Sequence, residues 1–172
     1  MIELGAPQIA ALLLLIQRGA EEIYSARNTR ALLDRGAREE GATYYPVVAV
    51  AHLSWIASLF FLVPTDAQLS WPLIGLYGIL QLARYWVIAT LGPYWTHRIV
   101  TLEEAPIVSS GAYGFVKHPN YVITVAETLL LPLAFSAVAL AFIMTAIWVA
   151  VLSYKISLED AALAARHRPT PP

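Results

Sequence analysis

Long apolar runs restrict the fold of this chain more than any other feature. The segment from Ala134 to Ser153 carries no charge, and Tyr45–Val63 and Trp71–Leu91 are each long enough for one crossing, because a bilayer core of about 30 Å needs roughly 20 helical residues. With 58% hydrophobic and 13% charged residues among 172, the composition lies outside that of a soluble domain. The sequence therefore predicts an integral membrane protein.

Five transmembrane helices account for these runs. The predicted spans cover about residues 2–20, 45–63, 71–91, 121–135 and 136–154. The last two form a tight hairpin, because the run from Tyr121 to Tyr154 is too long for one crossing, and Pro132 lies near its middle. A catalytic loop over 92–120 and a C-terminal cytosolic helix over 155–168 complete one membrane-embedded domain, residues 1–172. The expected fold class is all-α.

The loop charges predict an orientation, since Lys and Arg concentrate on the cytoplasmic side of a membrane. The first loop is rich in arginine, and the loop "PTDAQLS" has no basic residue. The third loop and the C-terminal tail are basic again. We therefore expect the N-terminus outside and the C-terminus in the cytosol. The abundance of arginine over lysine and of alanine favours a bacterial source, and hence a bacterial inner membrane.

Composition also excludes several functional classes. A net charge of −1 provides no basic field for nucleic-acid phosphates, and the absence of cysteine excludes disulfides and thiolate metal sites. The histidines are too widely separated for a ligand cluster: His52, His97, His118 and His167. We therefore expect neither a nucleic-acid partner nor a metal.

Polar residues cluster directly before the hairpin and at its exit. His118, Asn120 and Tyr121 stand at the start of the fourth span, where free backbone N–H groups favour an anion such as a carboxylate. Lys155 and Glu159 are four residues apart and so share one helical face. Together the two segments predict a pocket with an anion-binding end and an acidic end, which suits a zwitterionic or charged cofactor.

The segments "SSGAYGFVKHPNYV" and "KISLED" resemble the isoprenylcysteine carboxyl methyltransferase family, integral membrane enzymes that use S-adenosylmethionine. The resemblance extends from Ala105 to Asp160, and the residues that match the family pattern in order and spacing are Gly111, Tyr113, Lys117, His118, Pro119, Tyr121, Lys155 and Glu159. Lys117 and Lys155 stand where the pattern has arginine, so the charge is kept and the bidentate fork is lost.

The resemblance implies a role for each residue of a cytosol-facing cofactor cleft. The adenine would contact Ala105, Pro106, Ile107 and Val108; the methionyl part would contact His118, Pro119, Asn120 and Tyr121; and Arg98, Tyr113 and Glu159 would also approach the cofactor. Lys155 would meet the substrate.

The predicted activity is methyl transfer to an oxygen of a lipophilic small molecule or lipidated acceptor that arrives from the membrane lipids. A carboxylate is already ionised and needs mainly positioning. A phenol or enol benefits from a base, for which Glu127 and His97 are the candidates. The segments "LGPYWTHRIVTLEEAPIV" and "HPNYVITVAETLLLPLAF" are similar to a bacterial branch that methylates alkylpyrones and phenolic lipids.

Other interpretations remain open from sequence alone. Glu127 could be hydrogen-bonded across the hairpin, and Arg84 could pair with a hairpin carboxylate or extend toward the membrane surface. Lys155 and Glu159 could form an exposed ion pair. A membrane reductase that uses NADPH and a non-catalytic scaffold subunit are the alternative functions. The sequence contains no G-x-G-x-x-G motif that would favour the reductase.

Overall fold

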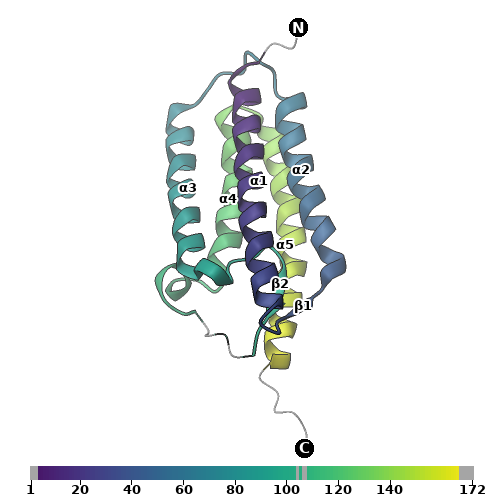
Figure 1. The fold of residues 1–172 in the computed structure, drawn as a ribbon. Helices are drawn as coiled ribbons and strands as arrows, with labels where there is room; N and C mark the ends of the chain where they lie inside the picture. The colour runs from purple at the N-terminus through teal and green to yellow at the C-terminus, as the bar shows by residue number, and fades with distance from the viewer. Residues whose placement is uncertain (1–3, 104, 106–107, 167–172) are drawn as a thin grey trace, which may run out of the picture.

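Five α-helices run side by side through the computed structural model, which describes residues 4–103, 105 and 108–166 (Figure 1). They are α1 (Ala6–Leu33), α2 (Tyr45–Leu62), α3 (Trp71–Leu91), α4 (Pro119–Ala134) and α5 (Val138–Arg166). The helical segments Ala42–Leu62, Trp71–Tyr94 and Val138–Ala164 are long and apolar enough to cross a membrane. The prediction of a mostly helical chain with five helices is therefore confirmed.

A small β-sheet corrects the all-α prediction. Strand β1 (Arg38–Glu40) pairs antiparallel with β2 (Ile99–Thr101), and Glu39 lies opposite Val100. The chain reverses after α1 at Gly36, whose φ of 89° is one that glycine adopts readily. The β-branched residues of β2 favour the extended backbone that receives β1. At the C-terminus, α5 runs without a break across the predicted boundary at residue 155.

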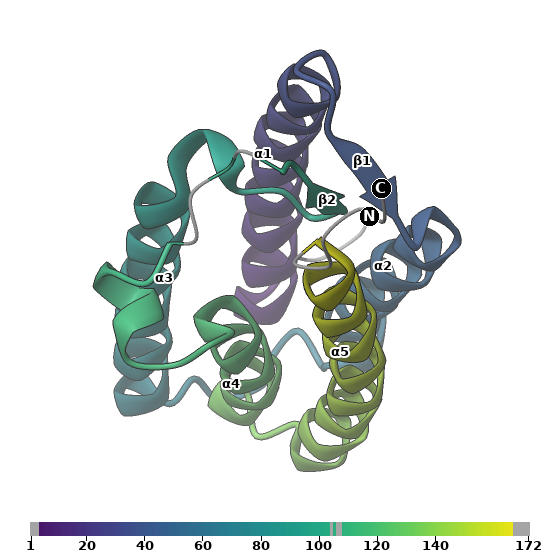
Figure 2. The same cartoon turned by 90° about the horizontal axis from the view of Figure 1, so that it is seen from below.

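The helices form a ring when viewed from below, in the order α1, α2, α5, α4 and α3 (Figure 2). Trp55, Leu59 and Leu131 are buried in the core that joins α2 to α4. The β-sheet, the loop after α3 and the last turns of α5 lie together at the lower end of the bundle (Figure 1). Polar segments that are distant in sequence are therefore gathered at one end.

A short turn at residues 135–137 joins α4 to α5. The backbone N–H of Ala137 donates to the carbonyl of Pro132, and that of Ser136 donates to Leu133, so the last carbonyls of α4 are satisfied. Ser136 adopts a left-handed φ of 59° at this helix end. Because the turn is short, the start of α4 lies beside the C-terminal half of α5.

Gly111 fixes the loop before α4 against α3. Its φ is 58°, and a Cβ at this position would lie 2.9 Å from the Thr90 hydroxyl oxygen. Only glycine combines this backbone conformation with so close an approach. The glycine of the "GAYG" segment therefore has a structural reason, and the short 3-10 helix η3 (Gly111–Gly114) follows from it.

Candidate active site

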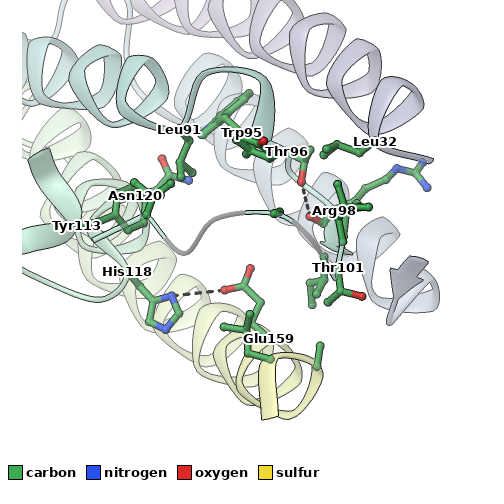
Figure 3. Close-up of a pocket in the computed structure, with 18 of the residues that line it drawn as sticks. Leu32, Leu91, Trp95, Thr96, Arg98, Thr101, Tyr113, His118, Asn120 and Glu159 are labelled. Carbon is green, nitrogen blue, oxygen red and sulfur yellow. Dashed lines mark hydrogen bonds and ion pairs between the residues drawn. The ribbon is translucent and has the colours of Figure 1, made fainter. Parts of the chain in front are cut away.

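A pocket of about 340 Å³ opens between the loop after α3, the start of α4 and the end of α5 (Figure 3). This volume lies within the range of about 300–1,000 Å³ that is usual for small-molecule sites. One wall carries His118, Asn120 and Glu159, and Arg98 and Thr101 lie on the opposite side (Figure 3). Apolar residues complete the lining, among them Leu32, Leu91, Trp95, Ile99, Val100, Leu102 and Leu163. The pocket thus combines charged and apolar walls.

Glu159 is the centre of the acidic end. The Tyr121 hydroxyl donates a hydrogen bond to its carboxylate, and His118 Nδ1 lies 3.4 Å from Oε2. Lys155 Nζ is 3.9 Å from Oε1. The His118 ring also stacks on Tyr121, with ring centroids 5.3 Å apart. These contacts connect the first turn of α4 to α5 and hold the carboxylate in the pocket wall.

The same wall also carries a group that suits a negatively charged part of a ligand. His118 Nε2 is buried and has no hydrogen-bond partner among the described residues, although Asp160 Oδ1 lies 3.7 Å away. Asn120 lies on the pocket in the first turn of α4, at the positive end of the helix dipole. A ligand carboxylate would suit the Asn120 amide at this helix end, and a ligand ammonium would suit Glu159.

Lys155 is buried, which rules out the exposed ion pair. Its side chain is 7% exposed, and Nζ donates to the His97 carbonyl at 2.8 Å. The ammonium also lies 5.2 Å from the centroid of the Tyr121 ring. Lys155 therefore fixes the loop after α3 against α5 while it lines the pocket.

Arg98 and Tyr113 complete the polar lining. Arg98 Nη1 pairs with Glu39 Oε1 at 2.7 Å, and its guanidinium lies 4.3 Å from the centroid of the Tyr45 ring. Burial, together with the nearby Glu159 charge, raises the pKa of Tyr113 to about 12. The Tyr113 phenol is therefore protonated at neutral pH and can donate a hydrogen bond.

The structure brings most of the predicted cofactor residues to one pocket. Those that line it are Arg98, Ala105, Val108, Tyr113, His118, Asn120, Tyr121 and Glu159, together with Lys155. Pro119 is buried in the first turn of α4 outside the lining. Pro106 and Ile107 fall outside the described residues. The binding roles of all these residues stay predictions.

The two candidate bases do not line the pocket. His97 is turned toward α1, where its Nδ1 lies 2.8 Å from Glu22 and its backbone N–H donates to Ser25 Oγ. Burial lowers the pKa of His97, and the Glu22 carboxylate opposes this shift. Its position therefore favours a structural role over proton transfer to or from a pocket ligand.

Glu127 lies in a buried ion-pair cluster between α1, α3 and α4. The carboxylate is 0% exposed and accepts hydrogen bonds from Arg84 Nε at 2.8 Å and from Arg18 Nη2 at 2.7 Å. Gln81 donates to it at 2.8 Å, and Glu21 lies 2.5 Å from Arg18. Of the two interpretations of Arg84, pairing with a carboxylate of the hairpin or extension toward the membrane surface, this geometry supports the pairing. Glu127 has no acceptor site left for a substrate.

Sequence reasoning missed the contribution of α1. Asn28 Nδ2 donates to the carbonyls of Gly92 and Trp95, at 3.2 and 2.9 Å, and the Trp95 side chain is buried. The signal was present as polar residues three or four apart on one helical face: Arg18, Glu21, Ser25 and Asn28. This face supports the pocket loop from behind.

Replacing Asn28 with alanine should therefore loosen the loop after α3. The buried Trp95 carbonyl and the partly buried Gly92 carbonyl lose this donor, which should lower the free energy of unfolding by about 1–3 kcal/mol. Thermal unfolding and hydrogen exchange at residues 92–97 would measure the change. Arg27→Ala, on the adjacent exposed position, is the control. Equal exchange in both variants would contradict the proposed support.

Comparisons with known proteins show which sequences this chain is similar to. The sequence model of the isoprenylcysteine carboxyl methyltransferase (ICMT) family matches residues 73–165. The uncharacterized protein YpbQ of Bacillus subtilis (strain 168) is 32% identical over 156 residues, which cover 88% of this chain and 92% of that protein. An uncharacterized protein of Haemophilus influenzae is 26% identical over 145 residues, 81% of this chain and 84% of its own. No solved structure matches the chain.

Proposed function

We propose that this chain, which belongs to the isoprenylcysteine carboxyl methyltransferase family, transfers a methyl group from S-adenosylmethionine to an oxygen of a lipophilic acceptor in the membrane. Family membership implies a membrane methyltransferase of this cofactor class. The observation that carries the proposal is the pocket that the Asn120 amide and the Glu159 carboxylate both line, with His118 in contact with Glu159. This pattern matches the carboxylate and ammonium of an amino acid.

The chemistry of the pocket fits the cofactor. His118 Nδ1 faces Glu159 and its buried Nε2 faces Asp160, so the His118 ring supports the acidic end, and the Asn120 amide is the group that would donate to the cofactor carboxylate. Glu159 would hold the ammonium, and the backbone at Ala105 and Val108 would hold the adenine. Bound there, the cofactor supplies an electrophilic methyl group on its sulfonium. The residues of the chain then hold the two reactants in line and exclude water.

The position of the candidate bases favours an acceptor that is ionised before it binds. His97 and Glu127 are turned away from the pocket and paired elsewhere. A carboxylate or an acidic enol of an alkylpyrone would need no base, whereas a simple phenol would need one. Lys155 lines the pocket and would attract such an anion. We therefore place the acceptor oxygen near the Lys155 ammonium.

We further propose that all five helices cross the bilayer, with the pocket at the cytosolic end and the N-terminus outside. The last turns of α1 and the segment that follows are rich in arginine and lie at the pocket end, where the positive-inside rule places such segments. The charged residues of α1 that would otherwise face lipid pair with α3 and α4 instead. Helices α4 and α5 would then cross as a hairpin.

Cofactor binding tests the proposal directly. The detergent-purified protein should be stabilised by S-adenosylhomocysteine, by about 2.7 kcal/mol when this ligand is present at 100 times its Kd. NADPH at the same concentration should have no effect. Thermal unfolding followed by intrinsic tryptophan fluorescence would measure both. Stabilisation by NADPH alone would replace the methyltransferase with the membrane reductase, and stabilisation by neither ligand would favour the scaffold subunit.

A further inference from the structure

We propose that Arg84 is a positioning residue that orients the Asn120 side-chain amide, so that its N–H groups face the carboxylate of the bound cofactor. This inference rests on the proposed function and adds a residue of the buried cluster to it. Arg84 itself is 1% exposed and does not line the pocket. It would therefore act on the cofactor only through Asn120.

Each nitrogen of the Arg84 guanidinium has at least one hydrogen-bond partner, and Nη1 also lies 3.6 Å from Glu21 Oε2. Nε and Nη2 donate to the two Glu127 oxygens at 2.8 and 2.5 Å. Nη2 also donates to Thr124 Oγ1 at 2.9 Å, and Nη1 donates to Asn120 Oδ1 at 3.2 Å. The pairing with Glu127 fixes the plane of the guanidinium, and the plane fixes the direction of Nη1.

This contact determines which end of the Asn120 amide faces the pocket. An arginine nitrogen can only donate, so the atom that it meets must be the amide oxygen. The amide nitrogen is therefore left on the other side, where Asn120 lines the pocket, and it donates to no residue in the part of the chain that the structure describes. Thr124 Oγ1 also donates to the Asn120 carbonyl at 2.9 Å, which holds the backbone of the same residue.

The orientation of the amide has a consequence for ligand choice. With Nδ2 toward the pocket, Asn120 presents two N–H donors there, and a ligand carboxylate can accept from them. With Oδ1 toward the pocket, it would instead repel a carboxylate. The buried ion-pair cluster around Glu127 should thus affect recognition of the amino-acid part of the cofactor and leave recognition of the adenosine part unchanged.

Two variants and two ligands test this inference. Arg84→Lys keeps the charge beside Glu127, but the single ammonium group cannot donate to Glu127 and Asn120 from separate nitrogens as the guanidinium does. Asn120→Asp keeps a partner for Arg84 and presents a carboxylate oxygen to the pocket. Isothermal titration would compare S-adenosylhomocysteine with 5′-methylthioadenosine, which lacks the amino-acid part. We expect both variants to bind S-adenosylhomocysteine at least about tenfold more weakly, with affinity for 5′-methylthioadenosine unchanged within about twofold.

A control separates this effect from a general disturbance of α4. Thr128 lies one turn further along the helix, where its hydroxyl donates to the Thr124 carbonyl; it is not a polar partner of Arg84 among the described residues and does not line the pocket. Thr128→Val should bind both ligands as the unmodified protein does. A parallel loss of both ligands in the variants, or no loss of either, would overturn the role of Arg84 while the methyltransferase proposal stands. Failure of the unmodified, folded protein to bind S-adenosylhomocysteine would instead overturn both.

Should Arg84→Lys not fold, Arg84→Gln is the second variant, since it also removes the Nη1 donor to Asn120. Asn120→Asp tests the other half of the inference, that an amide N–H of residue 120 faces the cofactor carboxylate. A selective loss of S-adenosylhomocysteine in both supports the inference, and an unchanged ratio of the two affinities in either contradicts it.

Discussion

Replacing Glu159 with alanine should lower the affinity for S-adenosylhomocysteine by roughly 100-fold, which corresponds to about 2.7 kcal/mol. The substitution removes the carboxylate that would hold the cofactor ammonium. It also removes the acceptor that holds the Tyr121 hydroxyl and lies 3.4 Å from His118 Nδ1. His118→Ala should cause a loss of similar size, because it removes the ring that contacts the Glu159 carboxylate and stacks on Tyr121. Isothermal titration of the detergent-purified variants would measure both effects.

Asp160→Ala is the matched control for this experiment. Asp160 is the next carboxylate along α5, but it is half-exposed, pairs with Lys117 at 2.6 Å and does not line the pocket. Its removal should change the affinity by no more than about threefold, because exposed ion pairs contribute little. Equal affinities in Glu159→Ala and the unmodified protein would contradict the assignment of the acidic end.

Replacing Glu127 with alanine should strongly destabilise the fold. It leaves the buried guanidinium groups of Arg84 and Arg18 without their shared partner. Breaking a buried pair in this way costs about 3–5 kcal/mol, because the remaining charge stays desolvated. We expect a large drop in thermal stability in detergent and a low yield of folded protein from membranes.

Glu127→Gln and Asp66→Ala are the variants with which the loss of stability in Glu127→Ala is compared. The glutamine keeps the shape and one acceptor oxygen, so its effect should be smaller than that of alanine. Asp66 lies in the exposed loop between α2 and α3, where substitution should change stability by about 0.5 kcal/mol at most. If Glu127→Ala unfolded at the same temperature as Asp66→Ala, the ion-pair cluster would contribute nothing to the fold.

The features that follow local rules could be predicted from the sequence. Apolar length indicated the helices, and the spacing of His118, Tyr121, Lys155 and Glu159 placed them on facing turns of α4 and α5. Pairings between distant segments could not be predicted in this way. Nothing in the local sequence of Glu39 indicates that it lies in a strand and pairs with Arg98.

The assignment of Glu127 shows the same limit. A carboxylate within an apolar helix indicates a buried polar contact, but it does not tell a substrate contact from a structural ion pair. Its partners Arg18 and Arg84 come from two other helices and meet it only in the folded bundle. The role of Glu127 could therefore be judged only from the packing of three helices.

The same cluster bears on how the chain enters the bilayer during synthesis. Arg84 leaves the ribosome well before Glu127, and an unpaired arginine at depth in a membrane is costly. Arg18 is accompanied by Glu21 within α1, so this cost falls mainly on α3. If all five helices cross the bilayer as proposed, α3 would be poorly stabilised in the lipid, or stay in contact with the insertion machinery, until α4 emerges and supplies the Glu127 carboxylate. Insertion then becomes a cooperative event that α4 completes, and chains truncated before residue 127 should be targets for membrane quality control.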